Sequence, residues 1–98
     1  MEKTIIIEPS NRKNKKFKIA YMKNNKMKFS HFGDSHYEDY TIHKDPLRKK
    51  RYINRHKKED WSNPFSPGTL SRYILWNKPT LSSSIDDYAN RFNLKILL

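Results

Sequence analysis

The stretch that decides the fold is KFKIAYMKNNKMKFSHF (residues 16–32), which has the pattern of two strands joined at Asn24-Asn25. Aromatic and aliphatic side chains alternate with lysines on both sides of the asparagine pair, as in strands with one buried face. Asparagine also tolerates the left-handed backbone conformation that tight turns require. The stretch therefore predicts a β-hairpin.

The length of the turn decides which side chains share a face of this hairpin. A two-residue turn pairs Tyr21 with Lys28, whereas a three-residue turn, with Asn25 in the left-handed region, pairs Tyr21 with Met27. We favour the three-residue turn because it separates apolar from cationic side chains. Its apolar face holds Phe17, Ile19, Tyr21, Met27 and Phe29, and its cationic face holds Lys18, Lys26 and Lys28.

Signals on either side of the hairpin complete the fold. Residues 3–8 (KTIIIE) predict a buried strand of β-branched residues. Proline after a capping residue starts helices at Pro46 and Pro67, and Thr80 caps a third helix. Apolar residues at i, i+4, i+7, i+8 and i+11 from Leu81 make this third helix amphipathic. The predicted fold class is α+β, a small antiparallel β-hairpin or sheet followed by three short helices.

We expect a single domain over residues 1–98, because a chain of this length supports one small core. It contains no cysteine, which excludes disulfides and thiolate metal sites. No apolar run is long enough to span a membrane or resembles a signal peptide, so a soluble protein is expected. The predicted parts are a basic β region over 1–32 with a basic loop over 9–16, a basic helix over 44–58, a two-helix scaffold over 66–93 and a terminal strand over 94–98.

The charge of the chain is strongly positive and unevenly distributed. Its formal net charge is +11, from 21 lysine and arginine residues and 10 acidic residues. Residues 1–58 hold 17 of these cations against 6 acids, whereas residues 59–98 hold four of each. This asymmetry predicts a positive surface that meets nucleic acid, an acidic protein or a charged membrane surface.

The basic helix over residues 44–58 is the centre of the positive region. Its apolar positions are sparse, and Arg48, Arg51 and Arg55 share one face through i, i+3, i+7 spacing. Phosphate recognition needs several cations on one surface. The candidate anion-binding residues are Arg12, Lys13, Lys15, Lys16, Lys44, Arg48, Lys49, Arg51, Arg55, Lys57 and Lys58.

Aromatic side chains near this helix have two interpretations. They can stack on bases, as in proteins that bind single strands or RNA. They can instead pack the helix onto the domain, which is the commoner role of large aromatic residues. The candidates are Tyr37, Tyr40, Tyr52 and Trp61.

Catalytic or metal chemistry is not indicated by the sequence. The histidines show no metal-site spacing, and no nucleophile lies in a pattern that pairs it with a base. We therefore predict no catalytic residue, no metal and no cofactor, and we do not expect an enzyme. The histidines are His31, His36, His43 and His56.

Two longer segments carry a family resemblance. Residues 37–61 (YEDYTIHKDPLRKKRYINRHKKEDW) and residues 70–92 (LSRYILWNKPTLSSSIDDYANRF) resemble a family of small uncharacterised proteins from giant (nucleocytoplasmic large) DNA viruses. The resemblance covers roughly residues 29–92. It implies a viral origin and transfers no catalytic residue. It also implies a location in the virion, or in the cytoplasm (viral factory) or nucleus of the host.

Two functions agree with these observations. The first is a small basic viral protein that binds nucleic acid, with DNA expected, non-specifically through its phosphates in the virion or viral factory. The alternative is a minor capsid or cement protein that bridges acidic viral structural proteins through the same cations. The expected partner is therefore nucleic acid or an acidic structural protein.

Overall fold

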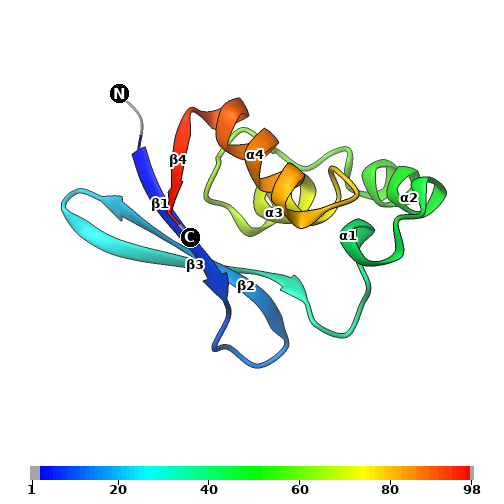
Figure 1. Cartoon of the computed structure of the whole chain (residues 1–98), viewed down its shortest axis with the longest axis horizontal. Coiled ribbons are helices and arrows are strands. Elements are labelled where there is room, and N and C mark those ends of the chain that lie inside the picture. Colours follow the sequence, from blue (N-terminus) through cyan, green and yellow to red (C-terminus); the bar gives the residue numbers. More distant parts are fainter. Residues whose placement is uncertain (1–2, 98) are drawn as a thin grey trace.

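The strands form one mixed four-stranded sheet in the computed structural model, which describes residues 3–97 (Figure 1). The first three strands of the chain pair antiparallel with one another in sequence order, whereas the last strand runs parallel to the first. The predicted terminal strand thus lies beside the predicted first strand, with Leu98 outside the described residues. In the order β3-β2-β1-β4, the strands are β1 (Lys3–Pro9), β2 (Lys15–Lys23), β3 (Lys26–Asp34) and β4 (Leu94–Leu97).

The helices begin where their capping residues predict. The side chains of Asp45, Ser66 and Thr80 each accept hydrogen bonds from backbone amides of the first turn. A further one-turn helix, capped by Asp39, lies between the hairpin and the helix that begins at Pro46. The helical segments are α1 (Tyr40–His43), α2 (Pro46–His56), α3 (Pro67–Leu70), its π-helical continuation η1 (Ser71–Leu75) and α4 (Leu81–Phe92). The α+β fold class is confirmed.

The hydrophobic core lies between one face of the sheet and the layer formed by α3, η1 and α4. Ile19 and Phe32 from the sheet meet Ile74 and Tyr88 from the helices, and all four are fully buried. The hydroxyl of Tyr88 donates a hydrogen bond to the backbone oxygen of Pro64 at 2.7 Å, and burial raises the pKa of this tyrosine. No helix within residues 3–97 has the length and apolar character to cross a membrane.

The hairpin register differs from the prediction. Asn24 and Asn25 form a two-residue turn, with φ of 53° and 63°, and Lys23 pairs with Lys26. Both asparagines thus occupy the left-handed region, as a type I′ turn requires, and the twist of this turn matches that of the flanking strands. The predicted three-residue turn is wrong because it placed only Asn25 in that region.

This register leaves one face of the sheet without a helical cover. Met22 pairs with Met27, and both lie with Phe29 on the side opposite the core. Lys18 lies on the same side, with its Nζ 5.3 Å from the centre of the Phe29 ring. The predicted separation of an apolar from a cationic face is therefore wrong for these side chains. We call this side the outer sheet face, and its exposed apolar residues are Ile6, Met22, Met27, Phe29 and Leu97.

Candidate anion-binding cleft

A cleft of about 640 Å³ lies between helix α2 and the core. One wall consists of the start of β2 and the loop from β3 to α1, and the other wall is α2. Residues of α3 and η1, with Trp76, complete the lining. Arg48, Arg51 and Arg55, which the spacing placed on one helix face, all line this cleft.

Gly33 allows the sheet and the helical layer to approach each other at the base of the cleft. Its φ is +82°, a value that side chains disfavour. A Cβ atom at this position would lie 2.7 Å from Cδ1 of Leu75 and 3.2 Å from Cβ of Lys16. Both the backbone conformation and the close approach therefore require glycine here.

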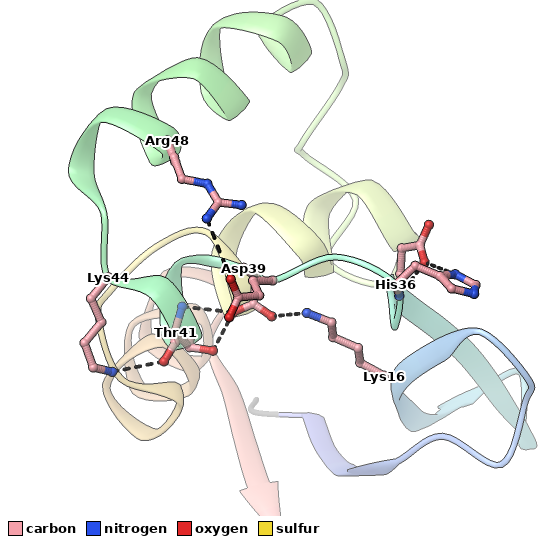
Figure 2. A network of polar contacts seen from close by, with 8 residues as sticks. Lys16, His36, Asp39, Thr41, Lys44 and Arg48 are labelled. Carbon is pink, nitrogen blue, oxygen red and sulfur yellow. Dashed lines mark hydrogen bonds and ion pairs between the residues drawn. The ribbon is translucent and has the colours of Figure 1, made fainter.

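A buried ion pair holds the wall between β2 and α1 (Figure 2). Nζ of Lys16 lies 2.6 Å from Oδ2 of Asp39, and the two side chains are only 13% and 4% exposed. The other carboxylate oxygen of Asp39 accepts hydrogen bonds from the backbone amide and the hydroxyl of Thr41. Lys16 was predicted to bind an external anion, and in the structure its charge is paired with Asp39 inside the protein, so its role in anion binding stays a prediction.

Each of the four carboxylates that line the cleft has a partner. The distance between the charged atoms varies from pair to pair. It is 2.6 Å between Nζ of Lys16 and Oδ2 of Asp39, and 3.8 Å between Nη1 of Arg48 and Oε1 of Glu38. Hydrogen bonds from the backbone and side chain of His36 lower the pKa of Asp34. The pairs are Asp39 with Lys16, Glu38 with Arg48, Asp34 with His36, and Glu59 with His56.

Three cations of the cleft have no such partner. Lys15, Arg51 and Arg55 form no ion pair with a carboxylate within residues 3–97, and all three are exposed. Arg51 and Arg55 lie one helical turn apart on α2, and Lys15 belongs to the opposite wall. An anion in the cleft can therefore be contacted from two sides. We call these three residues the surplus cations.

Two other predicted anion-binding residues are engaged elsewhere. Nζ of Lys44 donates to the backbone oxygen of Pro79 at 2.8 Å, and Nζ of Lys49 donates to that of Asn77 at 2.5 Å. Burial, and secondarily the nearby Arg72, lowers the pKa of Lys49. Both lysines thus satisfy carbonyl groups in the segment that follows η1, a common role for cations at helix ends. Whether they also bind an external anion stays a prediction.

The remaining predicted cations lie outside the cleft. Arg12 and Lys13 belong to the loop between β1 and β2, and Lys57 and Lys58 follow α2. All four are exposed and form no ion pair among the described residues. They enlarge the positive surface around the cleft, and their role in anion binding stays a prediction.

The predicted stacking residue Tyr52 is part of the packing. It is buried, and its ring is stacked on Trp76 with centroids 4.4 Å apart and planes 2° from parallel. Burial raises the pKa of Tyr52 to about 12. Tyr52 therefore anchors α2 to the helical layer, and its prediction as a free stacking surface is corrected. The sequence also missed Trp76, because no local spacing indicates this contact over 24 positions.

The other aromatic candidates differ in their accessibility. Trp61 makes an edge contact with Tyr73 and lies beneath the guanidinium of Arg72, and Tyr40 lies beneath Nζ of Lys49. Tyr37, by contrast, lines the cleft and is 70% exposed. Of the four predicted stacking residues, Tyr37 therefore offers the most open ring.

Within residues 3–97, no group of three or more histidine and acidic side chains is positioned to hold a metal ion. His56, which lines the cleft, is hydrogen-bonded to Glu59, and His36 is hydrogen-bonded to Asp34. The cleft presents cationic, acidic and aromatic side chains to a ligand.

The fold and the cleft define a small basic α+β protein with surplus cations beside a mixed sheet. The chain belongs to DUF5754, a family of unknown function, whose sequence profile matches residues 5–56. The matched segment extends from β1 to the last residue of α2, and it contains all three surplus cations. A comparison with curated proteins found no match, and a comparison with solved structures found none either.

Proposed function

We propose that this protein binds nucleic acid, with DNA expected, non-specifically through its phosphates. The observation that carries the proposal is the presence of the surplus cations Lys15, Arg51 and Arg55 on two walls of one cleft. A guanidinium group matches the geometry of a phosphate and can donate two parallel hydrogen bonds to it. The net charge of +11 adds long-range attraction for a polyanion.

We also propose a viral setting for this activity, on the basis of the resemblance in residues 37–61 and 70–92. In that setting the protein would accompany nucleic acid in the virion, or in the viral factory or nucleus of the host. Non-specific phosphate contacts suit such a role, because they do not depend on base sequence.

A salt titration tests the proposed binding. Fluorescence anisotropy with labelled duplex DNA, single-stranded DNA and RNA should show affinity that falls steeply as the salt concentration rises. Contact with about three to five phosphates predicts a log–log slope of about −2 to −4, because each phosphate contributes about 0.7–0.9. Weak binding at low salt to all three probes, or affinity independent of salt, would contradict the proposal.

The outer sheet face favours a second candidate, a minor capsid or cement protein that bridges acidic partner proteins. Its exposed Met22, Met27 and Phe29 are not covered by the helices, which pack on the other side of the sheet. Exposed apolar surface of this kind is typical of protein interaction sites. Lys95 is exposed on the same face, where Lys18 pairs with Glu8 at 3.5 Å, so the unpaired charge that an acidic partner would meet there is that of Lys95.

Lysine-directed cross-linking of purified virus particles tests this second candidate. If the outer sheet face is an interface, Lys18 and Lys95 should cross-link to neighbouring lysines of an acidic structural protein. Mass spectrometry of the digested particles identifies these cross-links, with the exposed Lys57 and Lys58, which follow α2, as internal comparison. Absence of the protein from the particles, or its presence only with the released genome, would contradict an adaptor role.

A further inference from the structure

We infer that the cleft accepts a single unpaired nucleotide, so that the protein prefers single-stranded nucleic acid to duplex. This inference rests on the proposed function and specifies the form of nucleic acid that the cleft recognises. Three properties of the cleft support it, namely its size, the arrangement of its charges and its exposed aromatic ring.

The size of the cleft suits a small ligand. Its volume of about 640 Å³ lies within the range of roughly 300–1,000 Å³ that is usual for small-molecule sites. A nucleotide with its phosphate is a ligand of this class. A base pair within a duplex is flanked by stacked neighbours and two backbones, so it cannot enter a site of this kind unless the base is displaced from the stack.

The arrangement of charges limits the favourable region to a short length of backbone. Arg51 and Arg55 line the cleft together with two glutamates. Glu38 precedes the two arginines in the sequence, and Glu59 follows them. These carboxylates are paired with Arg48 and His56, yet they still disfavour the approach of further phosphates. A duplex presents two phosphate backbones across grooves of about 6 and 12 Å, whereas the surplus cations line a single cleft and can neutralise only a short length of one backbone. A single strand can place one phosphate between the surplus cations and direct the next away.

Tyr37 supplies a surface that only an unpaired base can use. Its ring is 70% exposed although it lines the cleft, and no aromatic or cation–π contact to it occurs within residues 3–97. Proteins that bind single strands combine a basic groove with aromatic rings on which bases stack. In a duplex both faces of each base are already stacked on neighbours. The ring of Tyr37 therefore distinguishes an unpaired base from a paired one.

Binding of one DNA strand, alone and annealed to its complement, tests this inference in the full chain. At equal salt we expect the single strand to bind about tenfold more tightly than the duplex. This factor is the gain in affinity that one base stacked on an aromatic ring contributes. The Tyr37→Ser variant should lose about tenfold in single-strand affinity and keep its duplex affinity, whereas Tyr37→Phe should retain both. Phe29→Ser is the matched control, because it removes an exposed ring from the outer sheet face.

The possible outcomes separate this inference from the function on which it rests. Equal affinity for single strand and duplex, or an unchanged single-strand affinity in Tyr37→Ser, would overturn the nucleotide site and leave phosphate binding standing. An equal loss in the Phe29→Ser control would overturn it as well, because the effect would then not belong to the cleft. A lack of binding to either probe at low salt would overturn the proposed function itself.

Discussion

Replacement of Asp39 by alanine is expected to lower the free energy of unfolding by about 3–5 kcal/mol, the usual cost of breaking a buried ion pair. The carboxylate accepts hydrogen bonds from Lys16 and from Thr41, and it is almost completely buried. Its removal leaves the ammonium group of Lys16 largely buried without a counter-charge, and it also removes the cap of α1. A loss of this size is a large fraction of the stability of a small domain.

Urea denaturation followed by circular dichroism measures this effect. Asp34→Ala is the matched control, because Asp34 ends β3, just before the loop that contains Asp39, and forms an exposed pair with His36. Exposed ion pairs contribute about 0–1 kcal/mol to the free energy of unfolding, so this control should be nearly as stable as the parent protein. Replacing both members of the buried pair, as Lys16→Met with Asp39→Leu, should recover part of the loss because no unpaired charge remains. If the free energy of unfolding of Asp39→Ala fell by less than about 1 kcal/mol, the prediction would be contradicted, because water would then solvate the ammonium group of Lys16 in place of the carboxylate.

The parts of the fold that the sequence predicted correctly depend on local chemistry. The caps Asp45, Ser66 and Thr80 act on amides two or three residues away, so their effect is visible in a short stretch of sequence. The hairpin register depended on whether one or both asparagines adopt positive φ. The distribution of apolar residues suggested that only Asn25 does so, whereas both do in the structure. Met27 and Phe29 are exposed in the structure, so hydrophobicity alone could not determine the register.

The candidate site divides in the same way. The shared face of Arg48, Arg51 and Arg55 follows from helix periodicity, and the structure places all three at one cleft. Whether a cation is available depends on distant contacts. Lys16 and Lys49 bind groups that lie 23 and 28 positions away in the sequence. Such contacts are set by the tertiary fold, which is why spacing alone overestimated the number of available cations.

Replacement of both Arg51 and Arg55 by glutamine is expected to lower the affinity for nucleic acid by at least about 100-fold. Each arginine donates charge-assisted hydrogen bonds in the proposed complex, and such bonds contribute about 1.5–3 kcal/mol each. The log–log salt slope for a single strand should become shallower by about 1.4, since two phosphate contacts are lost. Both side chains are exposed and without carboxylate partners in residues 3–97, so the variant should fold like the parent protein.

The control for this prediction is Lys23→Gln with Lys26→Gln, which removes the same charge at the hairpin tip. The tip lies at the opposite end of the molecule from α2 (Figure 1). Charges separated by more than about 10 Å are largely screened at ordinary ionic strength, so this pair should change the affinity only slightly. Equal losses in the two double variants would show that net charge, and not the cleft, determines binding. A selective loss in the arginine variant would instead require local contacts on α2, because the two variants carry the same net charge.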